Sequence, residues 1–327
     1  MRAVLVRQPG GAEQLFLGEY PTPEPGEGEL LVRVRATALN RADILQRRGL
    51  YPPPPGASPI LGLEIAGVVE RAGPGCGGWR AGDRVFALVP GGGYAEYVTL
   101  PAAMAMPIPD NLGFEEAAAI PEAFFTAYQT LFWIGRLQAG ERVLIHAGAS
   151  GVGTAAIQLA RDAGADVLVT AGSEAKLAAC RALGASHAFN YKEGPFARRV
   201  LEATGGRGVD LVLDFVGAPY WEQNLECLAT DGRLVLIATM GGGVVERCDL
   251  RLLMAKRLQV TGTTLRSRSP EYKARLTREF VQRVLPRFAE GRLRPVIDRV
   301  FPWDRVAEAH RYMEANRNIG KIVLRVE

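Results

Sequence analysis

Short apolar stretches separated by glycine and proline turns fill the first third of the chain. Their spacing predicts strands at 1–7, 29–38, 65–72, 83–88 and 94–100. The loop at 51–56, Tyr-Pro-Pro-Pro-Pro-Gly, is expected to be stiff and extended, because proline fixes its own φ and restrains the residue before it. These features together predict a β-rich domain.

Near residue 121 the pattern changes to alternating helices and strands. An apolar helix is followed by predicted strands at 142–147, 166–170, 187–190, 210–216, 233–239 and 259–265. The strand at 210–216 is almost wholly apolar, which is typical of a sheet covered on both faces. The alternation predicts an α/β fold with a doubly wound parallel sheet.

The C-terminal part returns to long amphipathic helix, a strand bounded by prolines, a final helix and a strand at 321–326. We expect these elements to complete the first domain. The predicted domains are therefore 1–121 together with 266–327, and 122–265.

A glycine-rich segment, Gly-Ala-Ser-Gly-Val-Gly at 148–153, follows a predicted strand and opens a predicted helix. Glycines at such a turn let backbone N–H groups approach a pyrophosphate, whose charge the helix N-terminus stabilises. Two registers fit: G-x-G-x-x-A at 151–156, and 148–153 with serine at the middle glycine. We favour the second, which places Ser150 against a dinucleotide. The alternative is a turn that only packs a helix on the sheet.

The second strand of this domain ends in Thr-Ala-Gly-Ser at 170–173, where an acidic residue usually bonds the ribose hydroxyls of NAD. No carboxylate there repels a 2′-phosphate, and Ser173, Lys176 and Tyr191 are nearby donors. The sequence therefore favours NADP(H). The alternative is that Lys176 is a solvated helix residue and that Glu174 binds an NAD ribose.

Composition narrows the class of protein. The 327 residues are 48% hydrophobic, which is enough for two domain cores. Lys and Arg number 39 against 35 Asp and Glu, and the resulting charge of +4 is spread evenly, so neither nucleic acid nor a membrane surface is required. No leader-like or membrane-spanning apolar run is visible, so a cytoplasmic location is expected.

No metal site is predicted. The cysteines, Cys76, Cys180, Cys227 and Cys248, are scattered without C-x-x-C spacing, which argues against a disulfide framework and a structural zinc lobe. Catalytic zinc needs three or four converging ligands. The histidines are His146, His187 and His310, and each has a context compatible with a structural role. No Ser-His-Asp or Cys-His arrangement is visible, although residues of a triad can be distant in sequence.

Several segments resemble one known superfamily. They are Ala-Leu-Asn-Arg-Ala-Asp at 38–43, Leu-Gly-Leu-Glu at 61–64, Ala-Gly-Asp-Arg-Val at 81–85, Gly-Tyr-Ala-Glu-Tyr at 93–97 and Leu-Ile-His-Ala-Gly at 144–148. The chain resembles the medium-chain dehydrogenase/reductase superfamily over essentially its full length, and within it the zinc-independent, zeta-crystallin-like quinone oxidoreductases. Segments 53–58, 118–123 and 312–316 resemble the tumour-suppressor-inducible quinone oxidoreductase subgroup.

This resemblance implies a Rossmann NADP-binding domain at 122–265 and a GroES-like catalytic domain made of the remaining residues. Departures from the zinc alcohol dehydrogenases of the same superfamily favour metal-free chemistry. Asn40 lies near the place of their catalytic cysteine, Leu63 replaces the histidine before Glu64, and their cysteine-rich lobe is absent.

The resemblance also implies roles for individual residues. The nicotinamide and the substrate would be surrounded by Asn40, Tyr51, Thr126 and Ser150, and catalysis is assigned to Tyr51, Ser150 and Asn40. The phosphates and adenosine would be held by Gly151, Val152, Gly153, Gly172, Ser173, Lys176 and Tyr191. The rest of the cofactor would be enclosed by Met240, Gly241, Leu265, Arg266 and Asn316. The structural alternatives are that Asn40 caps a turn, Tyr51 packs on the prolines and Thr126 bonds backbone within its helix.

We therefore expect an NADPH-dependent quinone reductase in which Tyr51 and Ser150 donate hydrogen bonds to the acceptor oxygen as it becomes negative. One alternative is reduction of the C=C bond of an alkenal, enone or enoyl thioester. A second is a non-enzymatic, crystallin-like or RNA-binding role, which the low charge and the lack of interleaved aromatic and basic residues disfavour. Relatives also imply a homodimer or tetramer through the strand at 259–265.

Overall fold

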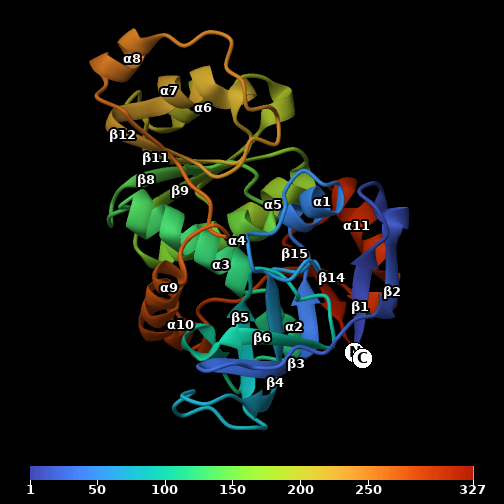
Figure 1. The fold of residues 1–327 in the computed structure, drawn as a ribbon. Coiled ribbons are helices and arrows are strands. Elements are labelled where there is room, and N and C mark those ends of the chain that lie inside the picture. The colour runs from blue at the N-terminus through green and yellow to red at the C-terminus, as the bar shows by residue number, and fades with distance from the viewer. Residues whose placement is uncertain (327) are drawn as a thin grey trace. The chain divides into compact units, whose positions relative to one another are not determined.

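A computed structural model describes residues 1–326 of the chain. The chain divides into two compact units: unit 1 is Met1–Phe125 with Arg266–Glu327, and unit 2 is Thr126–Leu265 (Figure 1). The first boundary lies four residues beyond the expected 121, because Phe124 and Phe125 pack on unit 1. Their rings lie 4.9 Å from Phe288 and 4.6 Å from Phe280, centroid to centroid.

Unit 2 contains one six-stranded sheet in the order β10-β9-β8-β11-β12-β13, and every neighbouring pair is parallel. The strands are β8 (Arg142–Ile145), β9 (Asp166–Ala171), β10 (His187–Asn190), β11 (Val209–Asp214), β12 (Leu228–Leu236) and β13 (Gln259–Gly262). The helices are α4 (Gly151–Asp162), α5 (Glu174–Ala182), α6 (Phe196–Ala203), α7 (Trp221–Cys227) and α8 (Leu250–Ala255). The short turns are η3 (Gln129–Ile134, a π-helix), η4 (Tyr191–Glu193) and η5 (Ala218–Tyr220). This strand order is that of a doubly wound fold.

The core of unit 2 is built from the apolar strands that the sequence pattern indicated. Leu144, Leu168, Val212 and Leu234, one from each of four neighbouring strands, are completely buried and pack with Phe196 of α6. A parallel sheet covered on both faces requires such continuous apolar strands.

Several predicted strands of unit 2 have different ends in the structure. β12 runs from Leu228 to Leu236 instead of 233–239, because Met240 and Gly241 turn back to donate hydrogen bonds to the carbonyls of Phe215 and Val216. β13 ends at Gly262 instead of Leu265. The expected strand at 210–216 ends at Asp214, whose carboxylate accepts hydrogen bonds from the next backbone N–H groups.

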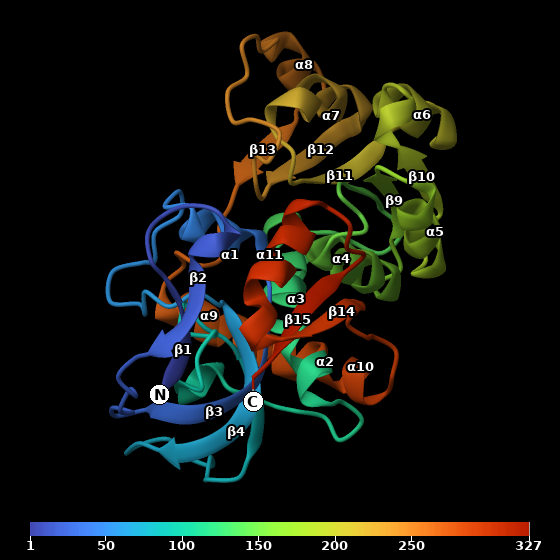
Figure 2. The same ribbon diagram turned by 90° about the vertical axis from the view of Figure 1, so that its right-hand side faces the viewer.

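Unit 1 contains a mostly antiparallel sheet in the order β14-β15-β3-β4-β5-β7, with β6 also paired to β3. Its strands are β3 (Glu29–Ala38), β4 (Glu64–Ala72), β5 (Arg84–Leu88), β6 (Tyr97–Pro101), β7 (Met106–Pro107), β14 (Ile297–Pro302) and β15 (Lys321–Arg325). A separate hairpin pairs β1 (Arg2–Val6) with β2 (Leu15–Glu19). The C-terminal β15 pairs with β3 near Ala38, so the end of the chain completes the sheet begun by the first third (Figure 2).

Helices and short turns surround this sheet. They are α1 (Arg41–Arg47), α2 (Phe114–Ala118), α3 (Pro121–Tyr128), α9 (Pro270–Arg283), α10 (Leu285–Ala289), α11 (Val306–Glu314), η1 (Ala12–Gln14), η2 (Ala102–Met104) and η6 (Trp303–Arg305). The chain passes from unit 1 into unit 2 within α3. None of the helices described in residues 1–326 has the length and hydrophobicity needed to cross a membrane.

Candidate functional site

The glycine-rich turn of unit 2 leaves no room for side chains at two positions. A Cβ at Gly153 would lie 2.4 Å from the carbonyl oxygen of Ala147 and 2.6 Å from that of Gly148. A Cβ at Gly148 would lie 2.8 Å from the Cβ of Val169 on β9. Ser150 is the N-cap of α4, and its Oγ accepts a hydrogen bond from the N–H of Gly153 at 3.0 Å. The turn therefore brings the first turn of α4 tightly against the end of β8.

This turn lies where a doubly wound sheet binds its ligand. β8 is paired with β9 on one side and β11 on the other, so the order of strands reverses at its carboxyl end. Ligands of open α/β sheets bind at this point, and the first N–H groups of a helix lack acceptors within the helix. The donors and the partial positive charge of the α4 N-terminus fit a phosphate.

The end of β9 carries no free carboxylate. Gly172 lies under the ring of Tyr191, because a Cβ there would be 2.6 Å from the tyrosine oxygen. Ser173 caps α5 and accepts a hydrogen bond from the N–H of Lys176. The carboxylate of Glu174 is paired with Arg181 at 2.6 Å on the surface. The hydroxyl of Tyr191 and the side chain of Lys176 thus remain candidates for contact with an adenosine phosphate.

His146 has a structural role in unit 2. It is completely buried, and its ring nitrogens lie 2.8 Å from Oγ1 of Thr170 and 2.7 Å from Oδ1 of Asn224. Burial lowers the pKa of His146, so the ring is neutral at ordinary pH.

Two predicted cofactor residues of unit 2 differ in exposure: Thr126 is buried, whereas Met240 is about half exposed.

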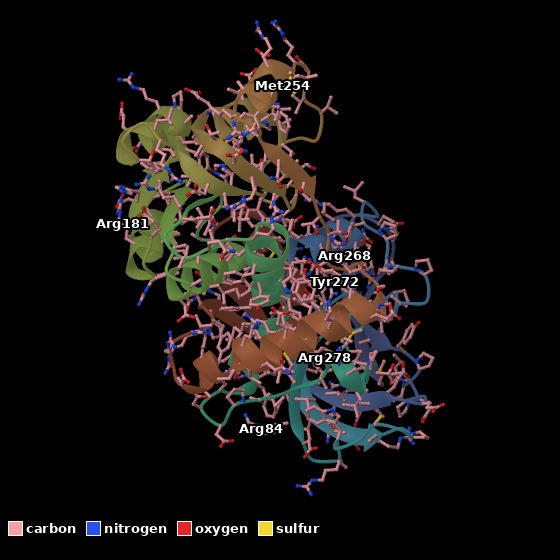
Figure 3. All side chains as sticks on the ribbon, turned by 90° about the vertical axis from the view of Figure 1, so that its left-hand side faces the viewer. Arg84, Arg181, Met254, Arg268, Tyr272 and Arg278 are labelled. Atoms are coloured by element: carbon pink, nitrogen blue, oxygen red, sulfur yellow. The ribbon has the colours of Figure 1, made fainter. Side chains whose placement is uncertain are left out.

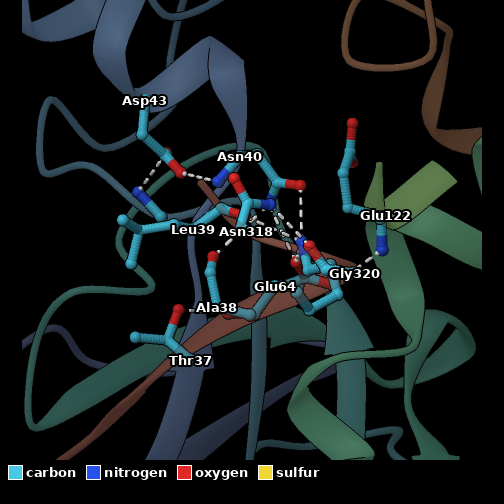
Figure 4. A network of polar contacts seen from close by, with 12 residues as sticks. Thr37, Ala38, Leu39, Asn40, Asp43, Glu64, Glu122, Asn318 and Gly320 are labelled. Atoms are coloured by element: carbon cyan, nitrogen blue, oxygen red, sulfur yellow. Dashed lines mark hydrogen bonds and ion pairs between the residues drawn. The ribbon is translucent and has the colours of Figure 1, made fainter. Parts of the chain in front are cut away.

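In unit 1, the buried carboxylate of Glu64 binds the side chains of Asn40 and Lys321 and the backbone N–H of Glu122. We call Asn40, Glu64, Glu122 and Lys321 the Glu64 cluster (Figure 4). Oε1 of Glu64 accepts hydrogen bonds from Nδ2 of Asn40 at 2.8 Å and from Nζ of Lys321 at 2.7 Å. Oε2 accepts one from the backbone N–H of Glu122 at 2.8 Å. The Glu64 carboxylate and the Lys321 ammonium are thus both removed from water, and their hydrogen bonds are formed. A buried ion pair is tolerated under this condition.

The amide of Asn40 is engaged at both ends. Its nitrogen donates to Glu64, and its oxygen accepts from Nζ of Lys321 at 2.7 Å. Asn40 is also the N-cap residue of α1, and its backbone N–H donates to Oδ2 of Asp43 at 2.7 Å. Asn40 therefore occupies a capping position, as the structural alternative proposed. The side chain of Asn40 also connects Lys321 of β15 to Glu64 of β4.

Asp43 is buried behind this cluster with its oxygens occupied. It accepts hydrogen bonds from the N–H of Gly62 at 3.0 Å and from the hydroxyl of Tyr94 at 3.2 Å. Burial raises the pKa of Asp43 to about 6, although its backbone donors oppose that shift. Asp43 thus ties α1 to the loop before β4.

Tyr51 packs on a buried arginine. The guanidinium carbon of Arg266 lies 5.4 Å from the centroid of the Tyr51 ring. Arg266 is 5% exposed, and its Nε and Nη2 donate to the carbonyl of Pro90, with Nη2 also donating to Gln46. Among the described residues no acceptor meets the buried Nη1. A buried N–H without a partner is costly, and a bound oxygen atom would satisfy it.

Two further predicted residues have identifiable surroundings. Asn316 accepts a hydrogen bond from Nη2 of Arg41 at 2.7 Å and has a left-handed backbone, with φ of 53°. Leu265, the last residue of unit 2, is 5% exposed.

The sequence analysis did not identify Lys321 and Glu122 as members of the site. A lysine directly before the apolar run Ile-Val-Leu at 322–324 was the one available signal for Lys321.

Residues 1–326 contain no group of three or more His, Cys, Asp or Glu side chains arranged to hold a metal ion. Leu63 is buried beside Glu64, and the cation that faces the Glu64 carboxylate is the ammonium of Lys321.

Comparisons with known proteins cover both units. Residues 26–110 match the family model of the alcohol dehydrogenase GroES-like domain, and residues 151–282 match that of the zinc-binding dehydrogenases. The quinone oxidoreductase of Rattus norvegicus is 32% identical over 327 residues, which are 99% of this chain and 97% of the relative. The chain belongs to the quinone oxidoreductase group of the medium-chain dehydrogenase/reductase superfamily. The predicted superfamily and fold class are confirmed.

A second relative is much longer. A mycocerosic acid synthase-like polyketide synthase of Mycobacterium tuberculosis is 35% identical over 322 residues, 98% of this chain. The chain spans 15% of that protein's length. The chain is thus similar in sequence to one segment of a polyketide synthase.

Solved structures show the same fold with different stated cofactors and activities. An NAD-dependent alcohol dehydrogenase has a TM-score of 0.89 and 37% identity, covering 100% of both chains. A mycobacterial protein complexed with NADPH has a TM-score of 0.87 and 33% identity, covering 99% of each chain. The CurK enoyl reductase has a TM-score of 0.88 and 29% identity, covering 100% of this chain and 99% of the other. The chain is therefore an oxidoreductase of a family that uses a nicotinamide cofactor.

Proposed function

We propose that this oxidoreductase uses NADPH to reduce a quinone or a similarly conjugated carbonyl compound, without a catalytic metal. The observation that carries the proposal is the pair of sites described above. The glycine turn of unit 2 suits a dinucleotide, and in unit 1 a lysine ammonium neutralises the carboxylate that follows Leu63. The quinone oxidoreductase relative supports the substrate class.

The residues of unit 2 fit a dinucleotide and would hold its charged part. Gly151 and Val152 would direct their backbone N–H groups at the pyrophosphate. Gly153, whose N–H donates to Ser150, would let the phosphate approach closely, and Ser150 fixes the turn by capping α4. The nicotinamide, when bound, would supply the hydride. Thr126, Met240 and Gly241 are proposed to contact the cofactor as the family resemblance implies, and so are Leu265, Arg266 and Asn316.

The preference for NADPH is proposed from the end of β9. Glu174, the carboxylate that could bond an NAD ribose, is paired with Arg181. Ser173, Lys176 and Tyr191 therefore present donors to a 2′-phosphate without a competing unpaired carboxylate. The structural neighbours include both an NAD-dependent enzyme and an NADPH complex, so the choice rests on these residues.

In unit 1 we propose that Tyr51 donates a hydrogen bond to the oxygen of the acceptor. Burial and the nearby Glu122 raise the pKa of Tyr51, so its hydroxyl stays protonated at neutral pH. A donor already in place stabilises negative charge that develops on that oxygen. Asn40 would act mainly by holding Lys321 and Glu64 in position, because its amide is engaged with both.

The experiment that tests this function compares acceptors side by side. A small ortho-quinone and an alkenal are each offered with NADPH, to the wild type and to Tyr51→Phe. Quinone reduction that falls in Tyr51→Phe while NADPH affinity is kept would support the proposal. Reduction of the alkenal alone would favour the double-bond reductase, which the enoyl reductase neighbour also supports.

We also propose that two copies pair through β13 across a two-fold axis. β13 ends the sheet of unit 2, and nearby apolar side chains are exposed. Leu250 is 62% exposed and Val260 is 36% exposed, and Met254, labelled in Figure 3, is 77% exposed. An exposed edge strand with apolar neighbours is suited to pairing with another chain. Light scattering that gives a dimer for the wild type and a monomer for Val260→Lys would support this arrangement, and a monomeric wild type would contradict it.

A further inference from the structure

Glu122 differs from the other members of the Glu64 cluster in the direction of its side chain. It lies in the first turn of α3, and its backbone N–H donates to Glu64. Figure 4 shows its carboxyl group extending away from Glu64. No group within residues 1–326 hydrogen-bonds to this carboxyl group. The acid is therefore held by its backbone, while its oxygens are unused.

The surroundings keep this acid protonated at neutral pH. Burial, and next the negative charge of Glu64, raise the pKa of Glu122 to about 8, and Asp43 acts in the same direction. The positive charges of Lys321 and Arg266 lower it, but by less. The ammonium of Lys273 on α9 is also within electrostatic range. Glu122 thus has a proton to give under conditions in which an exposed glutamate has none.

The same neighbourhood contains the donors proposed to face the acceptor. The charge of Glu122 acts on the pKa of both Tyr51 and Arg266, whose side chains stack on each other. Arg266 is held through Pro90 and Gln46 with its Nη1 unpaired. Unit 1 therefore contains an unengaged acid whose charge acts on a tyrosine hydroxyl and on a guanidinium with an unpaired N–H.

Asp43 does not share these properties. Its carboxylate already accepts hydrogen bonds from Asn40, Gly62 and Tyr94, and it is completely buried. A proton transferred from Asp43 would have to leave an occupied oxygen. Of the two acids whose pKa is raised in this region, Glu122 is the one with free oxygens.

We propose that Glu122 is the catalytic acid that protonates the reduced acceptor, an assignment that rests on the proposed function. Hydride addition places an electron pair on the conjugated acceptor and a negative charge on its oxygen. The O–H bond of Glu122 then breaks, and its proton forms a new O–H bond on the acceptor, giving the quinol or enol. The carboxylate left on Glu122 is reprotonated by water. The overall change is acceptor plus NADPH plus one proton to reduced acceptor plus NADP⁺.

The test is the pH dependence of quinone reduction by the full chain carrying Glu122→Gln, with NADPH affinity measured by fluorescence. General acid catalysis contributes about 100-fold or more, so kcat should fall by at least about tenfold while NADPH affinity is kept. The wild-type kcat should decline as pH rises through about 8, where Glu122 loses its proton. The Glu122→Gln variant should not show this decline in kcat. The Glu122→Asp variant should show it again and should recover part of the wild-type kcat.

The matched control is Glu115→Gln in α2, whose carboxylate pairs with Arg325 on the surface. It should keep the wild-type rate and pH profile. A Glu122→Gln variant with the wild-type kcat and the same alkaline decline would overturn the role of Glu122 and leave the proposed function standing. A wild type that binds NADPH but reduces no conjugated acceptor would overturn the proposed function, and this assignment with it.

Discussion

The glycine turn of unit 2 and the Glu64 cluster of unit 1 depend on different physical effects. The turn works through close backbone approach, and no charged side chain takes part in its closure. The cluster works through buried charge, with Glu64 completely buried and Lys321 only 4% exposed. The turn should therefore be sensitive to added volume and insensitive to pH. The cluster should be sensitive to changes of charge, and four substitutions can break or sharpen this contrast.

The largest effect is expected for Lys321→Met. This change leaves the carboxylate of Glu64 buried without its cation, which typically costs about 3–5 kcal/mol. Urea unfolding should show this loss, and the double variant Glu64→Gln with Lys321→Met should recover part of it. A loss below about 1 kcal/mol would mean that the pair is open to water, as exposed pairs are.

Gly153→Ala should come next. Its Cβ would lie 2.4 Å and 2.6 Å from two backbone oxygens, so the turn must open. We expect NADPH affinity to fall by about 100-fold, or about 2.7 kcal/mol, in a fluorescence titration. Gly262→Ala is the matched control in the same unit, because nothing lies within 4 Å of the added Cβ. Equal affinities for the two variants would contradict the steric account.

Glu122 should make the stability of the protein depend on pH. Its pKa is raised to about 8 in the folded state, so the folded state holds a proton that the unfolded state has lost above about pH 4.5. Stability should therefore fall as pH rises, by about 1 kcal/mol between pH 7 and 9. Glu122→Gln should remove this slope in urea unfolding at both pH values. A slope of the same size in the variant would assign it to other groups.

The smallest effect is expected at the end of β9. Lys176→Ala should weaken NADPH binding by about threefold, or about 0.7 kcal/mol, and leave NADH binding nearly unchanged. Glu174→Gln should change the affinities for NADPH and for NADH by less than about twofold, because the carboxylate of Glu174 is paired with Arg181 at the surface. A Glu174→Gln variant that loses NADH affinity selectively would instead identify Glu174 as a ribose ligand.

The contrast between the two regions also explains what could be predicted from the sequence. The strands of unit 2 and the turn at 148–153 were predictable, because their signals are local periodicity and glycine spacing. The Glu64 cluster was not, because Lys321 lies 257 residues from Glu64 and the sequence gives no sign that they meet. Likewise β2 and α1 were missed, since β2 contains a glycine and α1 has only seven residues.

The candidate site divides in the same way. Ser150 and Gly153 were recognised from their motif, and the structure shows how they close the turn. For Asn40 the resemblance implied a position but not its partners, which come from β4 and β15. For Glu122 the resemblance of segment 118–123 covered the residue but implied no role for it, because the direction of its side chain depends on how α3 packs in the folded unit.

The most direct test of the account is NADPH oxidation with a small ortho-quinone, measured after the protein has been treated with a chelator and its metal content determined. NADH serves as the comparison. We predict that the metal-free protein retains full turnover and prefers NADPH. Turnover that disappears with the metal and returns when zinc is added would contradict the account, as would a preference for NADH.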